Sequence, residues 1–147
     1  MEMLDQLVQL SERRNKSYLR LKKSFDEFRG SAIAFFDGKD QRGAIPWIHV
    51  SGDKDTGPLL VTYLGRQFVF EFSVSLLDTN LVGNVVVYEQ NTRIENVARR
   101  AAAILFQTNS LVSDFPPYSD GDPVYLGGNT ADTIYITLQL LEKAITT

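Results

Sequence analysis

The chain has 147 residues, of which 44% are apolar and 22% are charged. This composition is typical of one globular domain and excludes a disordered chain, whereas the net charge of −3 is too small to indicate a class of partner. The absence of cysteine excludes disulfide bonds and thiolate zinc sites. Because the sequence has no signal-peptide pattern and no long apolar run, we expect one soluble cytoplasmic domain over residues 1–147.

The first predicted element is a long amphipathic helix from Glu2 to Arg29. This segment contains neither glycine nor proline, and its apolar side chains recur about every 3.6 residues. They are Leu7, Leu10, Tyr18, Leu21, Phe25 and Phe28. Gly30 follows directly, and glycine commonly ends a helix because it adopts the left-handed conformation without strain. We therefore expect the helix to stop at Gly30.

Five strands are predicted in the middle of the chain, where apolar residues alternate with polar ones between turn residues. These strands are residues 32–36, 45–50, 59–64, 67–75 and 85–88. Gly65 and Arg66 suit a two-residue turn between the third and fourth strands. Phe68, Phe70 and Phe72 then share one face of the fourth strand, which predicts that this face belongs to the core.

Two more helices are predicted toward the C-terminus. Thr92 and Glu95 have capping-box spacing before an alanine-rich stretch, which predicts a helix from Thr92 to about Gln107. Residues 109–128 contain three prolines and are expected to form one long loop, after which Asn129 is expected to cap a last helix. The predicted fold is therefore α+β, an antiparallel five-stranded meander sheet covered by the long N-terminal helix and two C-terminal helices.

Few residues offer catalytic chemistry. The chain has one histidine, His49, and lacks both the Gly-x-Ser-x-Gly and the phosphate-loop motifs. Glu71 and Glu89 lie in predicted strands and would form a carboxylate pair if they faced the same side, although acids are also ordinary on the solvated face of a sheet. We predict no metal site, no cofactor and no enzymatic activity. An enzyme without a recognisable motif, using His49, Glu71 or Asp122, is kept as an alternative.

The first helix offers two candidate contact surfaces. Basic residues spaced by three and four form a stripe along it, and this stripe is a candidate contact for an anionic surface. Its members are Arg13, Lys16, Arg20 and Lys23. Nearby acids dilute this charge, so nucleic-acid binding is not expected. The predicted helix is about 40 Å long and therefore spans the whole domain or overhangs it. Overhanging turns around Leu4, Leu7, Val8 and Leu10 would need cover from a homodimer or a partner protein; a break near Ser11 or simple packing along the domain is the alternative.

The loop over residues 109–128 is the other candidate partner-binding region, because compact domains rarely keep so long an irregular segment without a purpose. Aromatic and acidic residues alternate in it, a combination suited to a basic protein. The candidates are Asp114, Phe115, Tyr118, Asp120, Asp122 and Tyr125. An ordered loop that packs these rings against its own domain explains the pattern equally well.

The leading hypothesis from the sequence is a non-catalytic intracellular protein-binding domain, such as an immunity protein, an antitoxin or a chaperone-like partner protein. It rests on the lack of catalytic motifs and on the acidic C-terminal part, where residues 110–147 carry five acids and one lysine. The alternative is a small-molecule-binding module with an apolar pocket between the phenylalanine face of the sheet and its helices. No membrane contact is predicted.

Overall fold

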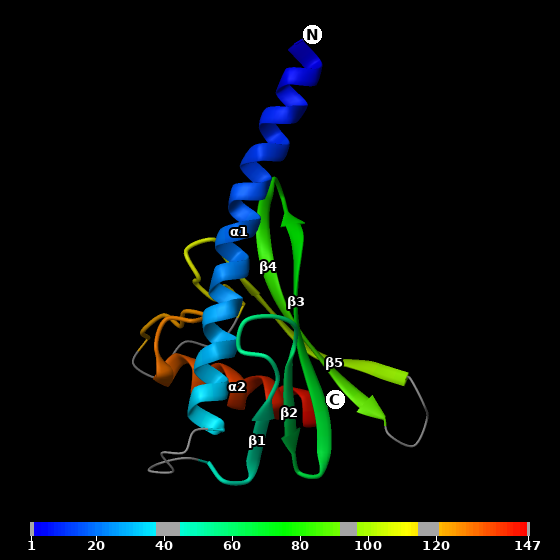
Figure 1. The fold of residues 1–147 in the computed structure, drawn as a ribbon, viewed down its shortest axis with the longest axis vertical. Helices are drawn as coiled ribbons and strands as arrows, with labels where there is room; N and C mark the ends of the chain where they lie inside the picture. Colours follow the sequence, from blue (N-terminus) through cyan, green and yellow to red (C-terminus); the bar gives the residue numbers. More distant parts are fainter. Residues whose placement is uncertain (1, 38–44, 92–96, 115–120, 147) are drawn as a thin grey trace.

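The computed structural model describes residues 2–37, 45–91, 97–114 and 121–146. The long helix α1 comes first, five strands follow, and the helix α2 comes last (Figure 1). Their bounds are α1 Glu2–Phe36, β1 Ile48–Ser51, β2 Leu59–Tyr63, β3 Arg66–Leu77, β4 Asn80–Asn91, β5 Val97–Phe106 and α2 Thr130–Ile145. The predicted α+β class is therefore confirmed.

The five strands form one open antiparallel sheet in the order β1-β2-β3-β4-β5, which is the predicted meander. Its strands differ greatly in length. Because β2 begins at Leu59, opposite Phe70, the last seven residues of β3 pair with β4 alone. The β3–β4 hairpin consequently extends as a two-stranded ribbon beside α1 (Figure 1).

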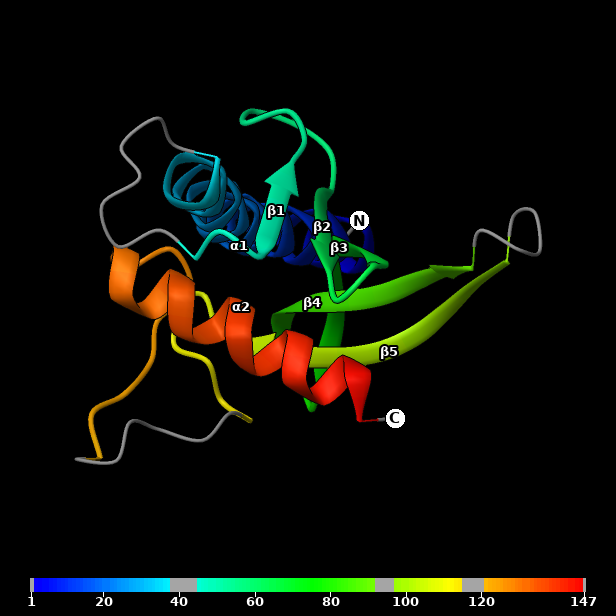
Figure 2. The same ribbon diagram turned by 90° about the horizontal axis from the view of Figure 1, so that it is seen from below.

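Both helices lie against the same face of the sheet, as Figure 2 shows from below. The core lies between the two helices and the sheet. It holds the buried residues of α1 from Leu21 onward, the inward side chains of the strands and the inner face of α2. Phe68 and Phe70 are fully buried there, and Phe72 packs at the margin. This confirms the predicted core face of β3.

The helix α1 does not end at Gly30, and the predicted strand over residues 32–36 is wrong. The helix continues to Phe36 because its buried side chains keep helical spacing. Phe28, Ala32 and Phe36 follow one another at intervals of four and all enter the core. Gly30 is simply an interior helix residue, without a positive φ.

The predicted helix over residues 92–107 is also wrong. Residues 97–106 form the edge strand β5, paired with β4 and carrying a β-bulge at Ala101. Ala102, Ile104 and Phe106 alternate toward the core with the period of a strand. The pairing offered by the long β4 outweighs the helix preference of the alanines. Thr92 and Glu95 lie outside the described residues, and α2 is the single C-terminal helix among those described.

One predicted turn is confirmed in part, and one predicted helix cap is confirmed. The β2–β3 turn consists of Leu64 and Gly65, one residue earlier than expected, and both have a positive φ, as a type I′ hairpin requires. The cap of α2 is as predicted, since the side chain of Asn129 accepts a hydrogen bond from the Asp132 amide at 2.7 Å. Leu138 lies on the exposed side of α2.

Candidate protein-binding surface

The first half of α1 extends away from the sheet (Figure 1). The helix has 35 residues and is therefore about 52 Å long, yet no residue of it before Leu21 is buried. We call residues 2–16 the projecting segment. Of the outcomes that the sequence left open, the structure shows the overhang, because α1 runs from Glu2 to Phe36 as one helix.

The projecting segment carries large apolar side chains in water. Met3 is 76% exposed, Leu7 and Val8 are each 58% exposed, and Leu4 is 53% exposed. Met3, Leu7 and Leu10 follow one another at spacings of four and three, so they lie along one side of the helix, with Leu4 and Val8 beside them. A grouped apolar stripe of this kind, unlike single exposed residues, is typical of an interaction surface.

The charges of the projecting segment are divided between its two ends. Residues 2–10 contain Glu2 and Asp5 and no basic residue, a net charge of −2. Residues 11–16 contain Arg13, Arg14 and Lys16 with one acid, a net charge of +2. The Lys16–Glu12 contact at 3.9 Å is exposed and contributes little to stability. The apolar stripe therefore joins an acidic end to a basic end.

The tip of the β3–β4 hairpin adds apolar side chains next to this helix. Leu76 and Leu77 are about half exposed. The ribbon contacts α1 closer to the core, where the centre of the Phe72 ring lies 5.9 Å from the centre of the Tyr18 ring and 5.7 Å from that of the Phe25 ring. The β2 side of β3 beyond Phe70 also has no strand partner among the described residues, a further feature of interaction-prone edges.

The basic stripe is present as predicted in one respect, because Arg13, Lys16, Arg20 and Lys23 are all exposed. Two other basic residues of α1 instead form ion pairs with Asp26: Lys22 at 3.0 Å and Arg29 at 2.9 Å. The role of the stripe as a contact for an anionic surface stays a prediction.

The structure describes three of the six partner-binding candidates in the loop over residues 109–128. The Asp114 carboxylate accepts a hydrogen bond from the Leu105 amide at 2.8 Å, so it satisfies the free edge of β5. Tyr125 donates its backbone amide to the Asp132 carboxylate at 3.1 Å, and Asp122 is exposed. The remaining candidates, Phe115, Tyr118 and Asp120, lie outside the described residues. The contacts of Asp114 and Tyr125 fix the loop against its own domain.

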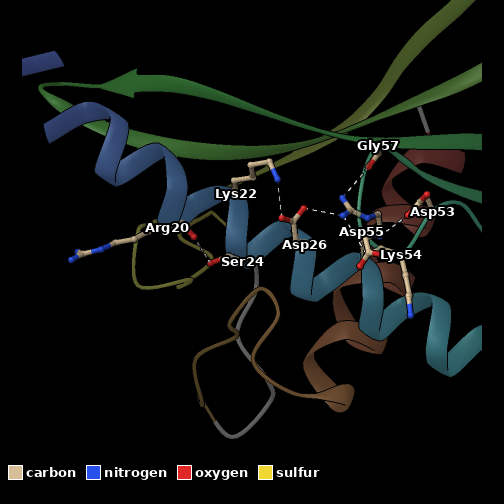
Figure 3. Close-up of polar contacts among 9 residues, drawn as sticks. Arg20, Lys22, Ser24, Asp26, Asp53, Lys54, Asp55 and Gly57 are labelled. Atoms are coloured by element: carbon tan, nitrogen blue, oxygen red, sulfur yellow. Dashed lines mark hydrogen bonds and ion pairs between the residues drawn. The ribbon is translucent and has the colours of Figure 1, made fainter. Parts of the chain in front are cut away.

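Arg29 is a buried polar centre that the sequence analysis did not identify; its partners Asp26, Lys54 and Gly57 are labelled in Figure 3. Its side chain is only 2% exposed. It donates to the carbonyls of Gly57 at 3.0 Å and Lys54 at 3.4 Å, and its guanidinium lies 5.5 Å from the centre of the Phe25 ring. It therefore fastens the β1–β2 loop to α1. The available signal was an arginine within the apolar face formed by Phe25 and Phe28.

A pocket of about 310 Å³ opens beside this arginine, between α1, the β1–β2 loop and β3. Phe25, Phe72 and Pro58 form its apolar walls, and Glu71 stands at its side. It is not the pocket expected from the sequence, because Phe68 and Phe70 pack into the core instead of lining it. Its basic groups already bind Asp26, which leaves little free charge for a ligand.

Glu71 and Glu89 do not form a catalytic pair. Glu89 pairs in register with Phe68, on the core face at its margin, whereas Glu71 pairs with Val86 on the opposite face. Glu89 accepts hydrogen bonds from Arg66 at 2.6 and 2.7 Å and from Arg99 at 2.9 Å. The bonds from Arg66, supported by Arg99, lower the pKa of Glu89 to about 2 against the opposing effect of burial. This is a structural ion-pair group.

His49 does not lie beside Glu71, the other strand residue that was considered for catalysis. It is exposed on the edge strand β1, opposite Thr62. Thr62 in turn pairs with Gln67 of β3, and Glu71 lies four residues after Gln67. His49 and Glu71 are therefore separated by about 13 Å along the strands and by about 10 Å across the sheet. In the part of the chain that the structure describes, no group of three His, Cys, Asp or Glu residues is arranged to hold a metal ion.

Comparison of the chain with protein-family models, with curated proteins and with solved structures found no match. No helix among the described residues is long and apolar enough to cross a membrane.

Proposed function

We propose that this chain is a non-catalytic protein-binding domain and that its contact surface is the apolar stripe of the projecting segment together with the tip of the β3–β4 hairpin. The observation that carries the proposal is the exposure of Met3, Leu4, Leu7 and Val8 on a helix that extends beyond its own core. An immunity protein, an antitoxin or a chaperone-like protein would each need such a surface.

Contact with a partner that removes the apolar stripe from water is energetically favourable. Moving one Leu, Val or Met side chain from water into an apolar contact contributes about 1.5–3 kcal/mol, and at least four such side chains are more than half exposed here. A helix also presents them in fixed positions, so less conformational entropy is lost when a partner binds than with a disordered segment. These conditions suit a helix that inserts into, or lies along, an apolar partner surface.

The arrangement of ionisable groups supports a non-catalytic role. A general acid or base must lie within about 3 Å of the group with which it exchanges a proton, and a neighbouring polar group usually holds it in that position. His49 and Glu71 are far from each other, and Glu89 is fully engaged with two arginines. These candidate residues therefore offer no catalytic constellation.

A binding experiment with a matched control tests the proposal. Tagged wild-type protein, a Leu7→Glu variant and a Leu138→Glu variant are incubated in native lysate, and stoichiometric co-purifying proteins are identified by mass spectrometry. Leu138 is also an exposed leucine on a helix, but it lies on α2, away from the stripe. We expect capture by the wild type and by Leu138→Glu and loss of capture with Leu7→Glu. Equal capture by all three proteins would refute the proposed surface.

A second candidate function is binding of a small molecule in the pocket beside Arg29. The observation in its favour is an apolar hollow of about 310 Å³ between Phe25, Phe72 and Pro58, at the lower limit of the volumes that ligand sites usually have. A thermal-shift screen distinguishes the two functions, because a true ligand raises the melting temperature in proportion to the logarithm of its concentration. That rise must disappear in a Phe72→Ala variant.

A further inference from the structure

We propose that the partner of the projecting segment is a second copy of this chain, whose projecting segment lies antiparallel along the first. This inference rests on the proposed function and names the partner. The apolar stripe is self-complementary when the two helices run in opposite directions. Leu7 of one copy then faces Leu10 of the other, and Met3 faces Arg14, whose methylene stem covers it.

The distribution of charge selects this direction. In an antiparallel pair, the end of each copy that carries Glu2 and Asp5 lies level with residues 12–15 of the other, and Glu2, which flanks the stripe, lies within reach of Arg13. The end with net charge −2 thus meets the end with net charge +2, twice. A parallel pair would place acids beside acids and bases beside bases, which is unfavourable.

The space around the helix also permits the contact. In Figure 1 the tip of the β3–β4 hairpin lies where the projecting segment meets the domain. The first turns of an antiparallel second helix would end next to this tip. The exposed Leu76 there offers an apolar surface for the partner's Met3 or Leu4. Since fifteen helical residues span only about 22 Å, the interface is small and the expected association is weak.

The absence of native cysteine permits a disulfide test that is specific for direction and register. Met3→Cys and Arg14→Cys are made singly and together and are oxidised at about 100 µM protein. Within one chain the two positions are about 16 Å apart, too far for an internal bridge. We expect the double variant to form a covalent dimer at least tenfold more efficiently than either single variant. In a Met3→Cys/Arg20→Cys variant the two cysteines do not meet in this register, so it must form no more covalent dimer than the single variants.

Light scattering on the wild type and on Leu7→Glu, from 10 µM to 1 mM, complements the crosslinking. We expect a concentration-dependent dimer for the wild type and a monomer for Leu7→Glu, with unchanged helix content by circular dichroism. Efficient crosslinking of Met3→Cys alone would overturn the antiparallel arrangement. A monomeric wild type at 1 mM, with no bridge in the double variant, would overturn the second copy as partner. Capture of a different protein that depends on Leu7 would then still support the proposed function, whereas no capture would end both.

Discussion

Arg29 of α1 donates a hydrogen bond to the carbonyl of Gly57 at 3.0 Å, which joins the long helix to the loop before β2 across 28 positions of the chain. The same guanidinium binds Asp26 at 2.9 Å and lies over the ring of Phe25. The loop has no side chain in the core between Gly52 and Pro58. Arg29 therefore replaces apolar packing as the contact that orders this loop.

Replacement of this arginine should be costly. Arg29→Ala leaves the Gly57 and Lys54 carbonyls without their donor and removes the packing of the buried side chain. We expect the free energy of unfolding, measured by urea denaturation, to fall by about 2–4 kcal/mol. Arg29→Lys should recover little, because an ammonium group cannot form the fork of hydrogen bonds. Arg20→Ala, at an exposed position of the same helix, is the control and should change stability by less than about 0.5 kcal/mol. An Arg29→Ala variant as stable as this control would contradict the assigned role.

Replacement of Gly30 should have the opposite effect on the free energy of unfolding. It lies in the interior of α1 without a positive φ, and an added Cβ would approach only the Lys54 carbonyl, at 4.0 Å. Gly30→Ala should therefore raise the free energy of unfolding by about 0.5–1 kcal/mol, because alanine loses less backbone entropy in a helix. If Gly30 instead ended the helix in the left-handed conformation, the same substitution would lower stability. Thermal unfolding of the two proteins distinguishes these cases by the sign of the shift.

Features set by local patterns could be predicted from the sequence. The alternation of Phe68, Phe70 and Phe72 located the core face of β3, and Asn129 marked the start of α2 because its cap is completed only three residues away. The length of the first helix showed that an overhang was possible, beside a break near Ser11 or packing along the domain. In each case the physical cause lies within a few neighbouring residues or in a simple length.

Features set by distant partners could not be predicted in the same way. The alanines of residues 98–103 favour a helix locally, and only the register with β4 makes this segment a strand. The contacts of Arg29 with the β1–β2 loop could not be predicted, because its acceptors there are the backbone carbonyls of residues 54 and 57, a group that every residue possesses. The hydrophobic stripe of the projecting segment was visible in the sequence, but its exposure was not, because burial depends on where the sheet ends.

Gly83 is required by the ring of Phe106, its register partner across β4 and β5. A Cβ on Gly83 would overlap Phe106 Cζ, and this ring is fully buried. Gly83→Ala should therefore lower the free energy of unfolding by about 1–3 kcal/mol through overpacking. The double variant Gly83→Ala/Phe106→Leu should lose less than the sum of the two single changes, since the smaller side chain relieves the clash. Additive losses in chemical denaturation would show that the ring and the glycine do not constrain each other.

Glu89 makes stability depend on pH. Because the pKa of Glu89 falls from 4.5 to about 2 in the folded chain, its ion pairs stabilise the fold fully above the unfolded pKa of 4.5. This contribution declines as pH falls through that range and is lost below about 2. After allowance for solvent screening we expect Glu89→Gln to lower the free energy of unfolding by about 1–2 kcal/mol at pH 7. The difference from the wild type should shrink between pH 5 and pH 2. Glu71→Gln removes an exposed carboxylate on the other face of β3 and should change stability little at any pH. A Glu89→Gln deficit that stays constant down to pH 2 would mean that the lost interaction is not the charged pair with Arg66.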